Sequence, residues 1–424
     1  MGTMSDFDMM NLPEALSKRV AAMGLSTPTP IQAQAIPHAL NGRDVMGLAQ
    51  TGTGKTAAFG IPLIARLMEE GGRAAPKTAR GLILAPTREL AGQIAQVLRE
   101  MTEMKVQIVV GGVSINPQIQ RLSKGVDILV ATPGRLLDLV DRRAVRLNET
   151  GFLVLDEADQ MLDLGFVHDL RKIAKMMGDN RQTMLFSATM PKQMAEIAAS
   201  YLHEPLRIEV APPGKAADKV TQEVHFIAKA EKSALLIELL GAHREERALV
   251  FTRTKHGADK LTKALDKAGY KVVAIHGNKR QGQRDRALAA FKARDVLVMV
   301  ATDVAARGLD IPDVKHVYNF ELPNVPEAYV HRIGRTARAG KDGAAIAFCA
   351  PDEMPYLKDI QKIMKIRIPV ASGRAWEEIP DPSAKPTGGR GRGRGRPDQP
   401  AAHRRGRRAQ PAPRLPHGHL PHLQ

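Results

Sequence analysis

AQTGTGKT, residues 49–56, is the stretch that decides the fold of this chain. It ends in Gly54-Lys55-Thr56, a pattern whose glycines let backbone N–H groups surround phosphate oxygens, while the lysine reaches terminal phosphates and the threonine ligates Mg²⁺. An apolar run at 44–48 predicts a buried strand before the loop, and a helical pattern follows it, whose N-terminus favours an anion. The alternative is a glycine-rich turn with an incidental lysine. The predicted nucleotide-binding residues are Ala49, Gln50, Thr51, Gly52, Thr53, Gly54, Lys55 and Thr56.

A second stretch, DEAD at 156–159, supports the nucleotide interpretation. The continuous apolar run at 152–155 predicts a strand buried on both faces of a parallel sheet. Carboxylates at the carboxyl end of such a strand lie where open α/β sheets bind ligands. We therefore expect Asp156 to hold Mg²⁺ together with Thr56, and Glu157 to polarise the attacking water. Taken alone, the stretch also fits an acidic helix N-terminus.

Length and composition limit the classes of protein that the chain can belong to. Its 424 residues suffice for two domains and a tail, and 43% are hydrophobic. The lone cysteine, Cys349, lies in an apolar run and permits no internal disulfide, which is typical of a reducing compartment. The first residues lack the pattern of a signal peptide, and no apolar run approaches the ~18 residues of a membrane span. We expect a soluble, cytoplasmic protein without a membrane partner.

The formal net charge of +17 predicts an anionic polymer as partner. Residues 384–424 carry +9 of it, and the other 383 residues carry +8. Aromatic residues make up only 4%, too few for extensive base stacking, so we expect nucleic acid to be held mainly by its backbone. The basic runs GRGRGR (391–396) and HRRGRR (403–408) predict a disordered tail that tethers RNA non-specifically. A merely solubilising tail is the alternative.

Strand-like and helical patterns alternate along the chain and predict an α/β fold with parallel sheets. A breaker cluster, APPGK at 211–215, divides the alternation into two blocks, and only the first has a phosphate loop. We predict a first domain at 1–210, a linker at 211–219, a second domain at 220–370 and an Arg/Gly-rich tail at 371–424. The expected strands are 44–48, 81–85, 107–110, 127–130, 152–155 and 183–186, then 248–251, 272–275, 296–300, 316–320 and 344–349.

From its first residue to about residue 370, the chain resembles the DEAD-box family of ATP-dependent RNA helicases. The run HGNK at 276–279 and the basic tail resemble the bacterial RhlE type within it. The resemblance implies two RecA-like domains, with ATP between them and RNA across both.

The resemblance also implies an adenine-reading motif in TPTPIQ at 27–32, with Phe7 upstream. The amide of Gln32 both donates and accepts hydrogen bonds, so it can pair with the edge of adenine. Phe7 would stack on the ring. The same run fits a helix start with Pro30 in the first turn, and both interpretations can hold together.

Further motifs resemble the family's RNA contacts and its coupling elements. PTREL at 86–90, Gly111-Gly112 and TPGR at 132–135 follow successive predicted strands, and QGQR at 281–284 and ATDVAARGLD at 301–310 belong to the second domain. The implied RNA-binding residues are Arg88, Gly112, Thr132, Arg135, Arg284, Thr302 and Arg307. Asp310 would contact the ATP ribose. Ser187 and Thr189, in SAT, would couple hydrolysis to strand separation.

HRIGRTAR at 331–338 resembles the motif that delivers arginines to the terminal phosphate. Guanidinium groups from a second domain stabilise a transferring phosphoryl group by about 10³–10⁵-fold in arginine-finger systems. Arg335 and Arg338 are three residues apart and can share one helix face. Ala337 stands where the family usually has glycine. An ordinary solvated basic helix is the alternative.

The motifs together predict an enzyme in which ATP and RNA close a cleft and hydrolysis reopens it. The predicted catalytic residues are Lys55, Asp156, Glu157, Arg335 and Arg338. Two other functions remain open: a DNA helicase or translocase on the same two-domain engine, and an RNA chaperone whose nucleotide site is vestigial. The complete set of charged nucleotide residues argues against the second.

Overall fold

A computed structural model describes residues 7–49, 52–210, 220–306, 311, 314–337 and 342–376. The chain divides into the units Met1–Trp376 and Glu377–Gln424, and the second lies outside the described residues. The predicted linker at 211–219 also lies outside them. So do five predicted site residues, namely Gln50, Thr51, Arg307, Asp310 and Arg338.

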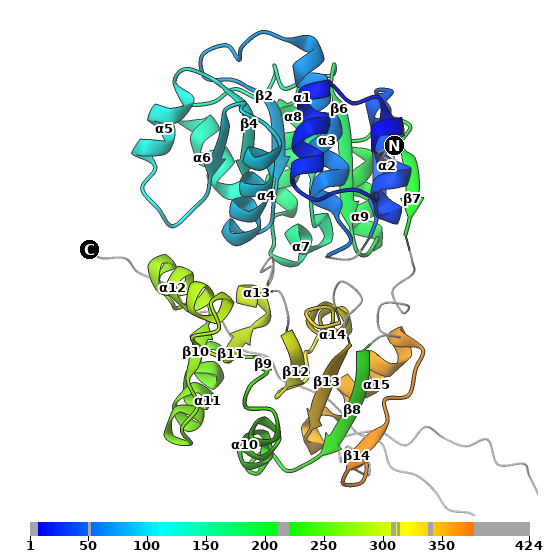
Figure 1. The fold of residues 1–424 in the computed structure, drawn as a ribbon. Helices are drawn as coiled ribbons and strands as arrows, with labels where there is room; N and C mark the ends of the chain where they lie inside the picture. The colour runs from blue at the N-terminus through cyan, green and yellow to red at the C-terminus, as the bar shows by residue number, and fades with distance from the viewer. Residues whose placement is uncertain are drawn as a thin grey trace, which may run out of the picture. The chain divides into compact units, whose positions relative to one another are not determined.

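The first lobe is a seven-stranded parallel sheet in the order β3-β4-β2-β5-β6-β1-β7 (Figure 1). Its strands are β1 (Val45–Leu48), β2 (Ala79–Leu84), β3 (Val106–Val109), β4 (Val126–Ala131), β5 (Phe152–Leu155), β6 (Gln182–Ser187) and β7 (Leu206–Glu209). Its helices are η1 (Asp8–Met10), α1 (Glu14–Ala22), α2 (Pro30–Leu40), α3 (Lys55–Glu70), α4 (Arg88–Met101), α5 (Asn116–Leu122), α6 (Pro133–Asp141), α7 (Ala158–Asp163), α8 (Val167–Met176) and α9 (Lys192–Ala199).

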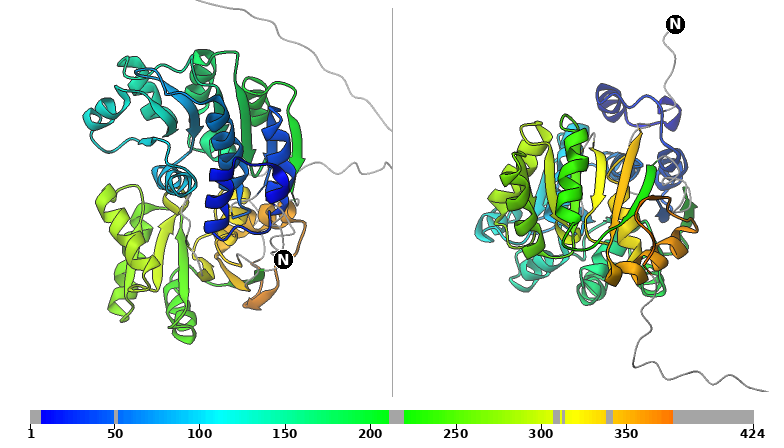
Figure 2. Two further views of the ribbon diagram at one scale, coloured as in Figure 1. Left: turned by 45° about the horizontal axis from the view of Figure 1, so that its top comes forward. Right: turned by 90° about the horizontal axis from the view of Figure 1, so that it is seen from below.

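Period-two alternation along the central strands divides the first lobe into two apolar cores. In β5, Phe152 and Val154 pack in the core shared with α1 to α4, while Leu153 and Leu155 pack in the core shared with α6 to α9. Because both faces are covered by helices, the strands need apolar residues at every position, as their sequences predict. Figure 2 shows helices flanking the sheet.

The second lobe repeats this architecture with the order β10-β11-β9-β12-β13-β8-β14. Its strands are β8 (Val220–Phe226), β9 (Arg247–Thr252), β10 (Val272–Ile275), β11 (Val298–Thr302), β12 (Val314–Asn319), β13 (Gly343–Cys349) and β14 (Val370–Ser372). Its helices are α10 (Lys232–Ala242), α11 (Lys255–Lys267), α12 (Gln281–Lys292), α13 (Asp303–Ala306), α14 (Pro326–Ile333), η4 (Pro351–Glu353) and α15 (Met354–Met364). The predicted α/β fold with two parallel-sheet lobes is confirmed.

Every strand expected from the sequence is present within a few residues, but β7, β8 and β14 were not predicted. These three lie at one side of their sheets, and their sequences lack a continuous apolar run. Described structure continues past residue 370, the predicted end of the second domain. β14 pairs with β8, and the Trp376 indole Nε1–H donates to the Cys349 carbonyl at 3.0 Å, so the lobe extends to Trp376.

The described part of the chain contains no helix long and apolar enough to cross a membrane. Parallel pairing brings the carboxyl ends of β1, β5 and β6 to one edge of the first sheet, since Leu48 pairs with Ser187 and Leu155 with Leu185. This edge carries the loops that contain the GKT, DEAD and SAT sequences.

Candidate active site

The phosphate loop joins β1 to α3 as predicted from its glycines. Gly52 and Gly54 have φ of 87° and 88°, in the left-handed region that glycine adopts without steric cost. Lys55 begins α3, so its ammonium group lies at a helix N-terminus. The ammonium donates to the Ala49 carbonyl at 3.2 Å and lies 3.7 Å from Asp156 Oδ1. The loop and the end of β5 thus place opposite charges side by side.

Asp156 and Glu157 follow β5 directly and are both 2% exposed. The Glu157 backbone N–H donates to Asp156 Oδ1 at 2.9 Å, and Glu157 has φ of 51°. A glutamate held in the left-handed region carries a strain of about 1–3 kcal/mol, which functional sites often store. Burial raises the pKa of Asp156 to about 6, Lys55 opposes that shift, and the charge of Glu157 adds to it. A buried carboxylate beside a cation suits a hard, hydrated divalent ion and a phosphate.

Asp159, the last residue of DEAD, holds the SAT segment. Its Oδ2 accepts from both the backbone N–H and the hydroxyl of Thr189, each at 2.9 Å. Its own backbone N–H donates to Ser187 Oγ at 3.3 Å, and that hydroxyl donates to the Thr189 carbonyl at 2.7 Å. Ser187 and Thr189 were predicted as coupling residues, but Asp159 was not singled out. Its side chain is the physical link between the two motifs.

The Gln32 amide binds the phosphate loop. Its Oε1 accepts from the Thr29 backbone N–H, and its Nε2 donates to the Gly54 carbonyl, both at 2.9 Å. One N–H and one lone pair of the amide remain for an adenine edge. Phe7 is 2% exposed and packs in the first lobe's core, so its ring presents no open face in this structure. Adenine stacking by Phe7 stays a prediction.

Four predicted RNA-binding side chains line one cavity of about 450 Å³, together with Gly111. They are Arg88, Thr132, Arg135 and Arg284. The three arginines come from loops and helix starts after different strands, so the sequence alone could place them only at sheet edges. Burial lowers the pKa of Arg88, Glu89 opposes that shift, and the nearby charges of Arg284 and Arg135 add to it. Such a convergence of cations suits a phosphate backbone.

Several contacts hold these arginines in position. Arg135 donates through Nη1 and Nη2 to the Val113 carbonyl at 3.1 and 3.2 Å. Arg284 Nη2 lies 2.9 Å from Glu89 Oε1, and Arg88 Nη1 donates to Gln281 Oε1 at 3.1 Å. Gly112 has φ of 71°, and a Cβ built on it would lie 1.9 Å from Arg88 Nη1. Any larger residue at Gly112 would therefore displace the Arg88 guanidinium, and the predicted contact of Gly112 with RNA stays a prediction.

In the second lobe, Arg335 is 3% exposed and lines a cavity with Phe251, Asp303 and His331. Its neighbour Arg332, not predicted as a site residue, is fully buried. The Arg332 guanidinium donates to both carboxylate oxygens of Asp303, at 2.5 and 2.8 Å. This pair ties α14, which precedes Arg335, to α13. Thr302 ends β11 next to Asp303 and is 8% exposed.

Ala337 has φ of 54°. The departure from the glycine usual at this place in the family therefore falls on a left-handed backbone position, where a Cβ is sterically unfavourable.

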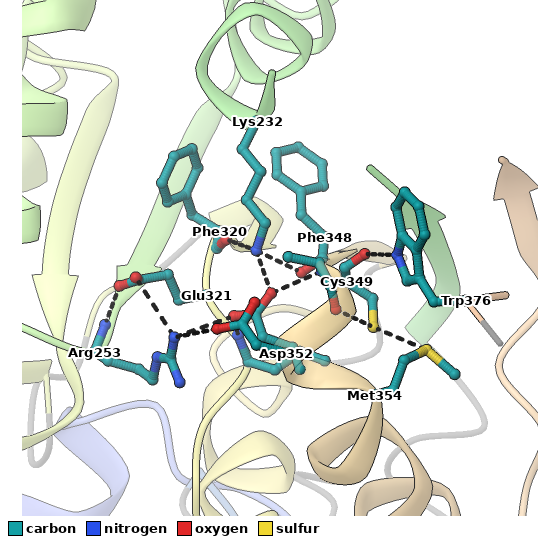
Figure 3. Close-up of polar contacts among 12 residues, drawn as sticks. Lys232, Arg253, Phe320, Glu321, Phe348, Cys349, Asp352, Met354 and Trp376 are labelled. Atoms are coloured by element: carbon teal, nitrogen blue, oxygen red, sulfur yellow. Dashed lines mark hydrogen bonds and ion pairs between the residues drawn. The ribbon is translucent and has the colours of Figure 1, made fainter. Parts of the chain in front are cut away.

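A buried polar network at the carboxyl edge of the second sheet went unpredicted (Figure 3). Lys232 Nζ donates to the carbonyls of Phe320 and Phe348 at 2.8 and 3.0 Å and pairs with the carboxylate of Glu353. Arg253 of the FTRT sequence joins it, with Nη2 3.7 Å from Glu353 Oε1 and 3.8 Å from Glu321 Oε1. A lysine and a glutamate 121 positions apart carry no local signal in the sequence.

Two family models match the chain: the DEAD/DEAH box helicase model over residues 29–197 and the helicase conserved C-terminal domain over residues 231–340. The ATP-dependent RNA helicase CshA of Listeria monocytogenes is 44% identical over 378 residues, which cover 88% of this chain and 72% of the relative. CshA of Bacillus anthracis is 44% identical, with coverage of 85% and 68%. These relatives carry the CshA name, so the comparisons do not support the RhlE type specifically.

Solved structures resemble the whole two-lobed part. Saccharomyces cerevisiae Dbp5 bound to RNA and ADP BeF3 has a TM-score of 0.78 and 33% identity, over 87% of this chain and 96% of that chain. Mss116p bound to ssRNA and AMP-PNP also has a TM-score of 0.78, with 28% identity, over 86% of this chain and 78% of that chain.

Proposed function

Because this chain belongs to the DEAD-box family of ATP-dependent RNA helicases, we propose that its two lobes hydrolyse ATP on binding RNA and thereby separate short RNA duplexes locally. The observation that carries this proposal is the buried group of Lys55, Asp156 and Glu157 at the phosphate loop.

Each residue of that group has a distinct task in the proposed reaction. Loop N–H groups and Lys55 bind the phosphates, and Glu157 orients a water and accepts its proton. Thr56 and Asp156 would hold Mg²⁺, which when bound neutralises the charge that develops between the phosphates. Arg335 and Arg338 stabilise the charge on the transferring group from the second lobe. Gln32 selects adenine, and its hydrogen bond to the Gly54 carbonyl connects the adenine site to the phosphate loop.

RNA is held by its backbone in this proposal. Arg88, Arg135 and Arg284 neutralise phosphates, and Thr132 and the backbone at Gly112 add hydrogen bonds. Thr302 and Arg307 contribute from the second lobe. The contacts of Asp159 with Ser187 and Thr189 connect the DEAD segment to the SAT segment. A movement of the DEAD segment on ATP hydrolysis therefore also moves the SAT segment, and this changes how the RNA strand is held. Because ATP and RNA favour the same state, each tightens the binding of the other.

Steady-state ATPase measurements with and without RNA test the proposal. Lys55→Ala and Glu157→Gln should each abolish RNA-stimulated turnover, while Glu157→Gln retains ATP binding because it keeps the side chain's shape. Near-normal turnover in either variant would contradict the roles assigned. Stimulation by DNA but not RNA would favour the translocase alternative, and RNA binding without any ATPase would favour the chaperone.

The finer assignments remain proposals. HGNK at 276–279 and the basic tail support the RhlE type. The charge of +9 on residues 384–424 supports a tether that binds RNA phosphates and weakens steeply with salt. Unchanged RNA affinity at low salt after deletion of residues 384–424 would reject the tether.

A further inference from the structure

Three side chains with metal-binding atoms gather in the second lobe, and none of them lines the cavity of Arg335. Among the described residues they are the one group of three or more histidine, cysteine, aspartate or glutamate side chains that can share an ion: His243, Glu246 and His316. Their ligand atoms all lie within 4.8 Å of one another. The group lies at the amino ends of β9 and β12, whereas Asp156 and Glu157 follow the carboxyl end of β5 and Thr302 ends β11.

A tight turn brings two of these ligands together. His243 caps the end of α10, and the Glu246 backbone N–H donates to the His243 carbonyl at 3.0 Å. This i to i+3 hydrogen bond fixes the turn immediately before β9 begins at Arg247. As a result, His243 Nδ1 lies only 3.5 Å from Glu246 Oε2.

Strand pairing supplies the third ligand. β12 pairs with β9 so that His316 stands opposite Ala248, two residues beyond Glu246. His316 Nε2 lies 2.5 Å from Glu246 Oε2, and the His316 ring stacks on the His243 ring with centroids 4.2 Å apart. The His316 side chain is 10% exposed and the Glu246 side chain 42%, so one ligand is anchored and the other is accessible. His243 and Glu246 also line a cavity of about 290 Å³.

We propose that His243, Glu246 and His316 bind a divalent transition ion of the Zn²⁺ class, with water as a fourth ligand. Two imidazoles and one carboxylate are a donor set that zinc accepts in proteins, at about 2.0–2.2 Å per ligand. Ligand atoms on such a tetrahedron are roughly 3.3 Å apart. The two contacts of Glu246, at 2.5 and 3.5 Å, bracket that value.

The groups around the site set its affinity. Burial lowers the pKa of His316, which keeps its ring neutral, and the bond to Glu246 opposes that shift. His243 and Lys315 add to the lowering. Arg244, Lys271 and Arg294 line the adjoining cavity and repel a cation, while Glu245 and Asp295 line it too and attract one. The guanidinium carbon of Arg244 lies over the Tyr270 ring, 5.0 Å from the ring centroid. Three protein ligands, against the four of a structural zinc finger, predict a weaker affinity and an ion that stabilises the lobe without being required for its folding.

Thermal unfolding of the full chain, stripped of metal and then given ZnCl₂, tests the site. The histidines at 403, 417, 419 and 422 are present in every variant compared below, so any zinc that they bind is common to all of them. A site in the folded lobe raises the midpoint by about 3–6 °C at saturating zinc. Co²⁺ added in place of zinc should give the visible absorption of a four-coordinate ion.

Matched variants make the result decisive. His243→Ala and Glu246→Gln change accessible side chains, so both should fold, and each should lower zinc affinity at least about tenfold and remove the rise in midpoint. His256→Ala, an exposed histidine of α11, should keep the full rise. No rise in the wild-type chain, or an equal rise in His243→Ala, would overturn the proposal and leave an ordinary histidine–glutamate hydrogen bond.

Discussion

Lys55 Nζ lies 3.7 Å from Asp156 Oδ1, and the two side chains are 6% and 3% exposed. The pair joins the phosphate loop to the DEAD segment. A buried pair at this separation is not a closed hydrogen-bonded ion pair, so both charges stay available to a ligand. The two charges are therefore positioned to bind Mg²⁺ and phosphate. Keeping them buried lowers the stability of the folded protein when no ligand is bound.

This cost gives the stability a specific pH dependence. Asp156 has its pKa raised from 3.8 to about 6, so the folded state binds its proton more tightly than the unfolded state. The associated stabilisation is fully present below about pH 4 and is lost as pH rises through 6. In Mg²⁺- and nucleotide-free buffer, wild type should lose roughly 3 kcal/mol relative to Asp156→Asn between pH 4 and pH 8. Urea unfolding of both proteins across this range measures the difference. A pH-independent difference would contradict the raised pKa.

Gly112→Ala should weaken RNA binding, because its methyl group would occupy the position of the Arg88 guanidinium. Losing one phosphate contact should reduce the slope of log affinity against log salt by about 1, uniformly across RNA sequences. Gly111→Ala is the matched control, since a Cβ there lies 3.9 Å from Arg88 in ordinary contact. RNA titrations at several salt concentrations measure both. Equal effects of the two substitutions on RNA binding would show that displacement of Arg88 is not the cause of the effect at Gly112.

The parts predictable from sequence were those with local patterns. The continuous apolar run of β5 and the glycines at 52 and 54 specify a buried strand and a phosphate loop, and both are present. Contacts between segments distant in sequence were not predictable. Asp159 reaches Thr189, 30 positions away, and Lys232 reaches Glu353, 121 positions away, because sheet order brings their strands' ends together. The strand order and register that bring such residues into contact cannot be recognised from the sequence of either segment alone.

Glu353→Gln should destabilise the second lobe strongly. Glu353 is 1% exposed and accepts from Lys232, from the Leu322 backbone N–H at 3.1 Å and from the Ala350 backbone N–H at 2.9 Å. Neutralising it leaves the Lys232 ammonium buried without its counter-charge, which typically costs about 3–5 kcal/mol. Denaturant unfolding measures the loss. Glu14→Gln, which removes an exposed partner of Lys18 on α1, is the control and should change stability little.

Ala337→Gly should stabilise the second lobe, although glycine is usually destabilising. Ala337 has φ of 54°, where a Cβ costs roughly 1–2 kcal/mol that glycine avoids. Replacement should therefore raise the unfolding free energy by about 0.5–1 kcal/mol, after the larger backbone entropy that glycine gives the unfolded chain is subtracted. Ala234→Gly, at an exposed helical position of α10, is the matched control and should lower it by about 1 kcal/mol. Chemical unfolding of the two variants beside wild type gives effects of opposite sign. If both substitutions destabilise the protein, the backbone at Ala337 is not left-handed in solution, and its position next to Arg338 does not require glycine.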